Sequence, residues 1–508
     1  MATGSAPSPE RGKVAPSPTA VALVVVTGAL MTVLDTTIVH VALNHLAGVL
    51  HAPLATMQWV TTGYTLALAS VIPLSAWAMD RVGAGRLYLL AIALFGAGSL
   101  LAGLAWNVES LILFRVLQGL GGGLVMPVGM AMVVRAADRR RMGRTMSLLG
   151  LPVLIGPLAG PTLGGWLVDH ASWRGMFLVN LPVAVLTLAL GWRILPRHRP
   201  PRTTTRLDLP GLLTLSPGLA LLIYGLATAG EHHRLTDPAA LTTTLAGLTL
   251  VTVFVLRSLR VEAPLIPLRL FAERTFTAGA LTMVAFPLAY FGSMVLTPLY
   301  LMLVHGLTAT QAGMLAIPQA LTTGVTMQVA SRMVDRVPAA RLVLCGIALA
   351  SSAMAGVALQ LGPDTPLWRL VSTLALMGAG VGMTMMPTLT AVSRELSDER
   401  TPAGTATLNI VSQVASATGT ALLSVTLAGA MSRRLPEGLG DLDALHRLSE
   451  RAREALAPEL AGAFQTAYGV AATVMALALL PAWALPRRRP DAPPDPVPDS
   501  GEPALERG

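Results

Sequence analysis

The chain has 508 residues, of which 53% are hydrophobic and only 12% are charged. A soluble protein carries about 25% charged residues, so this composition excludes a soluble globular protein and indicates an integral membrane protein. The formal net charge of +9 could indicate nucleic-acid binding, but the arginines lie at the ends of apolar segments rather than on one soluble face, which argues against that class. With Cys345 as its single cysteine, the chain cannot form an intrachain disulfide, and nothing suggests a thiolate metal site.

The elements begin with a Pro/Ser/Gly-rich stretch at 1–18, which we predict to be a disordered cytoplasmic tail leading into a retained first helix. It lacks the short apolar core and cleavage site of a secretory signal. Apolar segments long enough to span about 30 Å of hydrocarbon follow, and a second disordered cytoplasmic tail is predicted at 487–508. The fourteen segments are 20–43, 56–78, 87–106, 110–134, 143–168, 175–195, 209–229, 236–256, 276–304, 309–330, 342–361, 367–392, 403–431 and 464–485.

The distribution of lysine and arginine predicts how these segments are oriented, because cytoplasmic loops carry an excess of both residues. With the N-terminus inside, the inner tails and loops hold 27 of the 36 Lys and Arg residues, the outer loops hold 8, and Arg115 lies within a helix. This asymmetry predicts that both termini are cytoplasmic and that the number of spans is even. We therefore expect a multi-pass protein of the plasma membrane.

Two motifs recur in the same order, which indicates two homologous halves. Asp80-Arg81-Val82 follows the second segment and returns as Asp335-Arg336-Val337, and the Gly-x-Gly-x-Gly pattern that starts at Gly119 returns from Gly378. With six helices in each half, the seventh and eighth segments become an inserted pair. The predicted units are an N-terminal six-helix bundle at 19–200, the inserted pair at 201–260, and a C-terminal six-helix bundle at 261–486 with an outer loop at 432–463.

Two ionisable residues lie well inside predicted spans, where such groups are costly and are therefore functional candidates. Asp35 lies in the first segment, roughly 12 Å from its outer end, and Arg115 lies in the fourth, roughly 8 Å from its outer end. At similar depths they could pair directly or face one water-filled cavity. Burial favours a protonated carboxyl group and a nearby guanidinium favours the charged form, so opening such a site would move a proton on and off. A static structural ion pair is the alternative.

The fifth segment contains repeated glycines and prolines. Gly156, Gly160 and Gly164 recur every four residues, which strips one helix face to backbone and permits close approach of another helix. Prolines adjacent to the glycines add a kink. An ordinary packing face of small residues is the alternative. The complete pattern is Gly156-Pro157-x-x-Gly160-Pro161-x-x-Gly164-Gly165.

The motif after the second segment is predicted to be a cytoplasmic turn. Its Asp80 can complement the positive N-terminus of a nearby helix. Arg81 and Arg86 can reach acidic partners or lipid phosphates, and Gly83 completes the motif. A topology signal alone would explain the arginines but not Asp80.

Side chains suited to an adaptable apolar pocket gather in the ninth segment. Tyr290, Phe291 and Met294 are candidates for contacts with substrate, and Gln118, one turn beyond Arg115, is a polar candidate. Ordinary packing within the membrane is the alternative for each apolar side chain.

Together these features resemble a fourteen-helix drug/proton antiporter of the major facilitator superfamily, over about residues 20–485. Two departures from the first-segment motif are His40, where asparagine is usual, and Asn44, where proline is usual. The motifs that carry the resemblance are Leu34-Asp35-x-Thr37-Ile38-Val39, Asp80-Arg81-x-Gly83, Arg115-x-x-Gln118-Gly119, the glycine and proline pattern of the fifth segment, and Trp173-Arg174-x-x-Phe177-x-x-Asn180.

The resemblance implies an all-α membrane protein with the major facilitator fold, in which fourteen transmembrane helices form two six-helix bundles and an inserted pair. It implies proton-coupled efflux of drugs or antibiotics by alternating access. Asp35 and Arg115 would be the proton-coupling pair, the fifth-segment motif would shape a hinge and outer gate, and the motif at Asp80 would be a gating loop. The expected partners are a hydrophobic or cationic small molecule, protons and the lipid bilayer, with the protein acting as a monomer.

Other classes of function lack the residues that they need. No phosphate-binding GxxxxGK[ST] loop is present, which argues against ATP-driven transport. No cluster of His, Asp, Cys or Ser has catalytic spacing, so we expect neither an enzyme nor a cofactor or metal site. A dedicated exporter of one endogenous metabolite or self-made antibiotic remains an alternative, as does a proton-coupled importer.

Overall fold

The computed structural model describes residues 17–50, 52–138, 142–170, 172–195, 207–231, 236–262, 264–397, 399–436 and 450–487. The regular elements of these residues are all helical. The predicted tails and residues 437–449 of the predicted outer loop fall almost entirely outside them. The helices are α1 Pro18–Val49, α2 Leu54–Val71, α3 Leu74–Val82, α4 Ala84–Gly103, α5 Val108–Ala136, α6 Met142–Leu148, α7 Leu151–His170, α8 Gly175–Leu178, α9 Asn180–Ile194, α10 Leu209–Glu231, α11 Pro238–Ser258, the 3₁₀ helix η2 Leu268–Ala272, α12 Arg274–Leu303, α13 Ala309–Met333, α14 Ala339–Gln360, α15 Leu367–Gly382, α16 Met385–Glu395, α17 Thr401–Arg434, α19 Glu450–Leu477 and α20 Leu479–Ala482.

A helix or a broken helix lies over each of the fourteen predicted segments. The second segment is broken by a bend of 59° between α2 and α3, next to Pro73. Proline lacks an N–H and clashes with the preceding turn, which explains a sharp bend at that point. The last segment extends further toward the N-terminus than expected, because α19 already begins at Glu450 and buries Ala457 and Leu460.

The described helices support many membrane spans without establishing fourteen. Within the described residues, eleven helices are long and apolar enough to cross a membrane, and the bent pair of α2 and α3 raises this number to twelve. The two remaining predicted segments are occupied by α7 and α13. The count of fourteen spans therefore remains a prediction.

The helices pack as two groups that follow the order of the chain. In the first group α1 packs on α7, and α5 packs on both α2 and α4; in the second, α12 packs on α17, and α15 packs on α13 and α14. One large core cluster is drawn entirely from residues 278–485, and another is drawn mainly from residues 21–195. Each group thus buries a core of its own.

The hairpin of α10 and α11 lies between these groups in sequence and contacts both, because α10 packs on α2 and on α17. A buried carboxylate secures its base. Asp208 pairs with Arg257 at 2.6 Å and accepts hydrogen bonds from the backbone N–H of Gly211 and Leu265. These contacts join the start of α10, the end of α11 and the segment that leads to α12.

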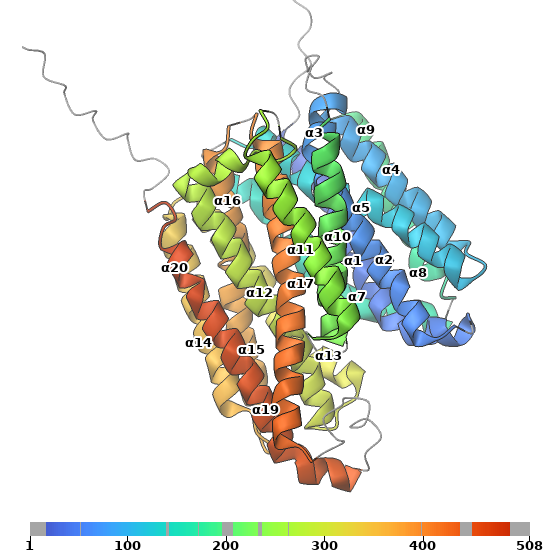
Figure 1. Ribbon diagram of the computed structural model, residues 1–508, viewed down its shortest axis with the longest axis vertical. Helices are drawn as coiled ribbons and strands as arrows, with labels where there is room; N and C mark the ends of the chain where they lie inside the picture. The colour runs from blue at the N-terminus through green and yellow to red at the C-terminus, as the bar shows by residue number, and fades with distance from the viewer. Residues whose placement is uncertain are drawn as a thin grey trace, which may run out of the picture.

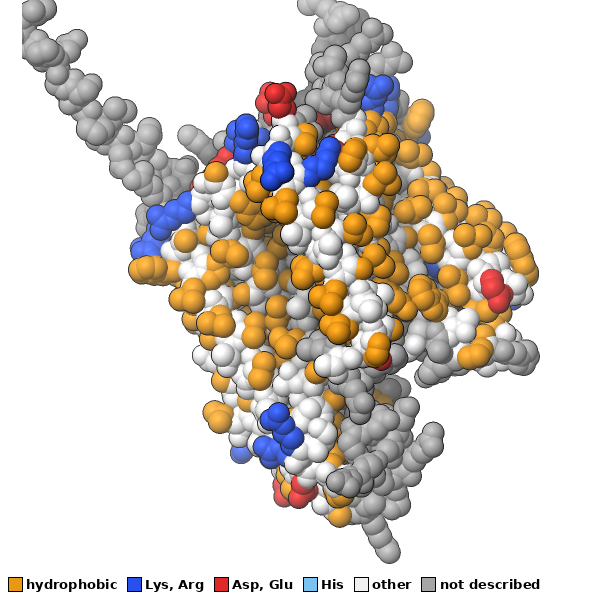
Figure 2. Space-filling view, in the orientation of Figure 1, with side chains coloured by type: hydrophobic (Ala, Val, Ile, Leu, Met, Phe, Trp, Pro, Cys, Tyr) orange, Lys and Arg blue, Asp and Glu red, His pale blue; other side chains and the backbone are white. Residues whose placement is uncertain are grey.

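The start of α1 and the end of α20 lie at the same end of the bundle, which is uppermost in Figure 1. We call it the terminal end. Hydrophobic side chains cover the middle of the visible face, and charged side chains are concentrated toward its ends (Figure 2). Large apolar residues such as Leu213, Leu256 and Trp192 are more than half exposed. An exposed apolar belt with charged ends is the surface expected of a chain that spans a bilayer.

Candidate functional site

Asp35 and Arg115 form a direct ion pair inside the first group of helices. Arg115 Nη1 lies 2.6 Å from Asp35 Oδ2, and the two side chains are 1% and 0% exposed. Asp35 lies on α1 and Arg115 on α5. Of the two arrangements left open by the sequence, a direct pair or a shared water-filled cavity, the structure shows the direct pair.

Three more polar side chains complete this cluster. The amides of Gln118 and Asn180 both donate to Asp35 Oδ1, at 2.8 Å and 2.9 Å. Both amides also donate to the hydroxyl of Ser99 at 3.1 Å, and Ser99 donates to the carbonyl of Phe177 at 2.8 Å. Each partner of the Asp35 carboxyl group is thus a donor, which matches the charged carboxylate rather than the protonated acid.

Arg115 is held on its other side by α2. Its Nε donates to the carbonyl of Val60 at 3.2 Å, and its guanidinium lies 4.2 Å from the centre of the Tyr64 ring. Its Nη1 also donates to Gln118 Oε1 at 2.7 Å. The hydroxyl of Tyr64 is buried without a hydrogen-bond partner. A buried cation held by a carboxylate, a carbonyl and an aromatic face is well compensated for its loss of water.

Local sequence explains how five helices converge on this point. Arg115 and Gln118 are three residues apart on α5, so they share one face of the helix. Gly98 lets α4 approach that face, because a Cβ atom at this position would lie 2.6 Å from the Cα atom of Gln118. Ser99, the residue after Gly98, is thereby brought against the side-chain amides of Gln118 and Asn180. Close contact between helices at small residues is typical of membrane proteins.

The glycine face of α7 packs against α1 at the level of Asp35. A Cβ atom added at Gly160 would lie 2.0 Å from Thr37 Oγ1, and one added at Gly156 would lie 2.2 Å from a methyl group of Val33. Gly164 of α7 likewise faces Ile38 of α1. The predicted close approach is therefore present, and its partner is the helix that carries the buried carboxylate. The side chains of Pro157 and Pro161, and Gly165, lie outside the described residues.

The predicted gating motif lies at the terminal end, in the turn between α3 and α4. Gly83 has a φ of 91°, a conformation that favours glycine, and Arg81 and Arg86 are exposed. Asp80 interacts electrostatically with Arg135 at the end of α5.

The repeated motif makes a contact between the two groups of helices. Asp335 pairs with Arg394, and its carboxylate also accepts hydrogen bonds from the backbone N–H of Gly143 at 2.8 Å and of Arg144 at 3.0 Å. We call these four residues the Asp335 latch. Gln328 adds a hydrogen bond of 2.6 Å to the carbonyl of Ser147. These bonds fasten α6 to the second group at the terminal end.

The predicted substrate-contacting residues divide between two places. Gln118 lies in the Asp35 cluster. Tyr290 stacks on Phe286 and contacts Phe291 edge to face, all on α12, and Met294 is 45% exposed. Neither of the two described surface hollows is lined by any of these four residues, so their role in substrate contact stays a prediction.

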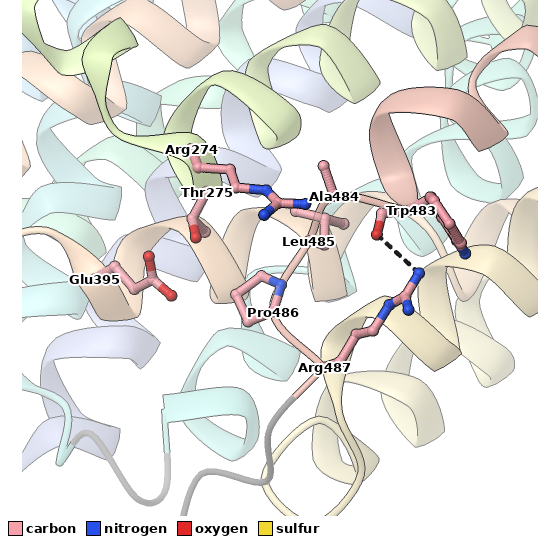
Figure 3. A pocket seen from close by; sticks show the side chains of 8 residues that line it. All are labelled: Arg274, Thr275, Glu395, Trp483, Ala484, Leu485, Pro486 and Arg487. Atoms are coloured by element: carbon pink, nitrogen blue, oxygen red, sulfur yellow. Dashed lines mark hydrogen bonds between the residues drawn. The ribbon is translucent and has the colours of Figure 1, made fainter. Parts of the chain in front are cut away.

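A surface hollow of about 580 Å³ lies at the terminal end, where α12 begins and α16 and α20 end. Figure 3 shows charged side chains at its edge, among them Arg274, Glu395 and Arg487. A charged rim does not suit a lipophilic substrate. Among the residues that the structure describes, no three or more His, Cys, Asp or Glu side chains are grouped to hold a metal ion.

Two members of the Asp35 cluster were not singled out as site residues from the sequence. Asn180 lies in a stretch that supports the family resemblance, so a signal for it was present. Ser99 had no such signal, since serine is common in membrane helices and its role depends on the glycine beside it.

Comparisons with known proteins agree with this architecture. A family model described as Major Facilitator Superfamily matches residues 25–420. The chain is 39% identical over 406 residues to a protein of Mycobacterium tuberculosis named "Multidrug resistance protein B homolog", covering 80% of this chain and 75% of the relative. It is 33% identical over 413 residues to a "Putative multidrug resistance protein MdtD" of Pectobacterium atrosepticum, covering 80% and 86%.

Two solved structures share the fold at low sequence identity. The human organic anion transporter TETRAN matches with a TM-score of 0.61 at 15% identity, over 92% of this chain and 100% of the other. The proton:xylose symporter XylE matches with a TM-score of 0.62 at 14% identity, over 91% and 94%.

Proposed function

The chain belongs to the major facilitator superfamily of membrane transporters, and we propose that it exports hydrophobic or cationic small molecules in exchange for protons across the plasma membrane. In this proposal both termini are cytoplasmic, the protein acts as a monomer, and fourteen spans form two six-helix bundles with an inserted pair. The transport cycle is alternating access, in which the two bundles rock about a site between them.

The observation that carries the proton-coupling part is the Asp35–Arg115 pair. A carboxylate at 0% exposure inside a membrane helix is costly unless it is paired, and such groups commonly serve as proton relays. Protonation would neutralise Asp35 and weaken its attraction to Arg115. Proton binding would thereby loosen α1 from α5, which supplies a physical link between the proton and the arrangement of the helices.

The contacts between the two groups support a rocking motion. The Asp335 latch closes the terminal end, and the glycine face of α7 lets α1 lie against it at backbone distance. In the proposed cycle, the latch stabilises the state that is closed to the cytoplasm. The α1–α7 contact transmits changes at Asp35 toward the outer gate.

The proposed substrate class rests on the names of the relatives and on the chemistry of the chain. Two relatives more than 30% identical are named as multidrug resistance proteins. The aromatic residues of α12 and the methionines nearby suit an apolar or aromatic solute. A dedicated exporter of one endogenous metabolite or self-made antibiotic has the same architecture, and an importer is favoured less by these relatives.

The test is proton-gradient-driven transport in everted membrane vesicles. Wild type should accumulate a fluorescent lipophilic cation or an uncharged antibiotic, and an uncoupler should abolish the accumulation. Asp35→Asn should lose transport against a gradient at equal expression, as should Arg115→Ala. Asp208→Asn is the matched control, because it changes another buried, paired carboxylate that does not touch the cluster.

The outcomes separate the parts of the proposal. Transport by Asp35→Asn at the wild-type rate against a gradient would contradict the proton assignment. Movement of one narrow class of compound only would favour the dedicated exporter. Uptake into whole cells that depends on the proton gradient would favour the importer.

A further inference from the structure

The two oxygens of the Asp35 carboxylate have different surroundings. Oδ1 accepts from the amides of Gln118 and Asn180, and the same two amides converge on the hydroxyl of Ser99. These four groups form a closed ring of hydrogen bonds, which we call the Oδ1 ring. Oδ2 lies outside the ring and is bound by Arg115.

The direction of each bond in the Oδ1 ring is determined by its neighbours. Gln118 Oε1 accepts from Arg115, so its Nε2 must face Asp35. Ser99 donates its single hydrogen to the carbonyl of Phe177, so its oxygen can only accept from the two amides. Oδ1 therefore faces two N–H groups, and a proton on it would oppose both of them.

We propose that Asn180 and Ser99, together with Gln118, are positioning residues that direct the transported proton to Oδ2 of Asp35, so that protonation has to open the ion pair with Arg115. This inference rests on the proposed proton-coupled function. In the step itself, an incoming proton forms an O–H bond with Oδ2, and the hydrogen bond from Arg115 Nη1 to Oδ2 breaks. Arg115 keeps its proton, no electrons are transferred, and the cluster gains one positive charge.

The structure also provides a place for Arg115 after this step. The carbonyl of Val60 at 3.2 Å and the face of Tyr64 at 4.2 Å both belong to α2 and do not depend on Asp35. The Oδ1 ring still ties α1 to α4 and α9, and through Gln118 to α5. Proton binding would thus remove only the Arg115 contact between α1 and α5, which makes the response of the helices specific. Without the ring, a proton could settle on Oδ1 and leave the ion pair intact.

The test measures protonation of Asp35 directly, by infrared difference spectra of the purified full-length protein in lipid nanodiscs across a pH series. Subtraction of Asp35→Asn isolates the carboxyl band. Asn180→Leu removes a donor to Oδ1, and Ser99→Ala removes the shared acceptor but keeps both amides. Thr187→Val is the matched control, because Thr187 is buried on α9 and bonds to Thr27 and Val183.

In Asn180→Leu the carboxyl band should persist to higher pH, with proton binding strengthened about tenfold, the effect of losing roughly one hydrogen bond to a charged group. Ser99→Ala should change in the same direction, and Thr187→Val should match wild type. Proton leak without substrate should rise in vesicles that contain Asn180→Leu, because the proton no longer has to open the pair. Tyr64→Leu should slow proton-driven transport, because it removes the aromatic face that holds Arg115 after the step.

Identical titration of wild type, Asn180→Leu and Ser99→Ala would overturn the inference, even if efflux is intact. A wild-type protein that shows no Asp35-dependent carboxyl band would overturn both the inference and the proton assignment. A wild-type protein that binds a proton at Asp35 but moves no drug against a gradient would contradict the efflux function alone.

Discussion

The carboxylate of Asp335 accepts a hydrogen bond of 2.8 Å from the backbone N–H of Gly143, a residue 192 positions earlier in the chain. Asp335 repeats Asp80; Asp335 pairs with Arg394 on α16, and Asp80 interacts with Arg135 on α5. Each copy of the repeated motif thus places its acid against an arginine, and the acid of the second copy also reaches across to α6. This relationship makes the terminal end of the molecule open to direct test.

Asp335→Asn should weaken the latch and favour a state that is open at the terminal end. The substitution removes the charge that strengthens bonds to Gly143, Arg144 and Arg394, and hydrogen bonds to charged groups contribute roughly 1.5–3 kcal/mol. The measurement is the rate of maleimide labelling at Ser147→Cys in a Cys345→Ala background, since Ser147 is 1% exposed beside this contact. Labelling should become several-fold faster.

The matched control for the latch is Glu273→Gln. Glu273 pairs with Arg400 at 2.5 Å in an exposed position at the same end, and exposed ion pairs contribute little to stability. In the Glu273→Gln variant, the rate of labelling at Ser147→Cys should equal that of the parent protein. Equal rates for Asp335→Asn and the parent would show that the latch does not control opening.

Gly160→Ala should impair transport more than it impairs expression. The new methyl group would lie 2.0 Å from Thr37 Oγ1, so α7 and α1 would have to separate at the level of Asp35. We expect at least a tenfold loss of transport rate together with a lower melting temperature. Gly469→Ala is the control, because a Cβ atom there has no neighbour within 4 Å and alanine favours the helix. Wild-type transport by Gly160→Ala would show that the close approach is dispensable.

Asp208→Asn should loosen the hairpin of α10 and α11 without abolishing the proposed proton-driven transport. Asp208 is 4% exposed in its side chain and joins Arg257 to the backbone of Gly211 and Leu265. Replacing the acid leaves Arg257 without its counter-ion, which should cost about 1–3 kcal/mol. Thermal unfolding, monitored by size-exclusion chromatography, should reveal this loss of stability. The protein that remains folded should still carry out transport driven by the proton gradient. An unchanged melting temperature would mean that the hairpin is held mainly by apolar contacts.

His305, between α12 and α13, should make the stability of the protein depend on pH. Burial lowers the pKa of His305, although the nearby Asp364 opposes this shift. Because the folded protein disfavours the charged imidazole, its stability should be fully present above the ordinary histidine pKa of about 6.5 and should decrease as the pH falls below it. The Nε2 atom lies 3.2 Å from the Tyr300 hydroxyl, and that hydroxyl donates to the carbonyl of Gly362.

His305→Gln retains an N–H donor for Tyr300 but cannot be protonated. Between pH 7 and pH 5, the melting temperature of the variant should therefore fall less than that of wild type. At pH 7.5 the two proteins should have similar melting temperatures. Equal acid sensitivity in the two proteins would assign that sensitivity to other groups.

Several features could be predicted because they depend on local pattern. Apolar length predicts membrane helices, and a helix or broken helix lies over each predicted segment. The recurrence of Asp80-Arg81-Val82 at Asp335 indicates two related halves, and this division stays a prediction. The cost of charge in lipid singled out Asp35 and Arg115, and the structure brings them to 2.6 Å.

Other features depend on contacts between segments far apart in the chain. Asn180 lies 145 residues from Asp35, and a polar residue near the end of a predicted helix does not reveal which oxygen it will reach. Ser99 acquires its role because Gly98 lets α4 approach Gln118 closely. Such approach depends on the shapes of both helices, and sequence periodicity describes only one helix at a time.

The sequence by itself determined that this chain is a helical membrane protein, where its helices lie, and which two charges are too costly in lipid to be incidental. Hydropathy and charge are properties of single segments, so they can be read without knowing neighbours. Only the tertiary structure decided that Asp35 binds Arg115 through one oxygen and two amides through the other. That arrangement arises where five helices meet, and hydrogen-bond direction is set by partners that the linear order does not place together.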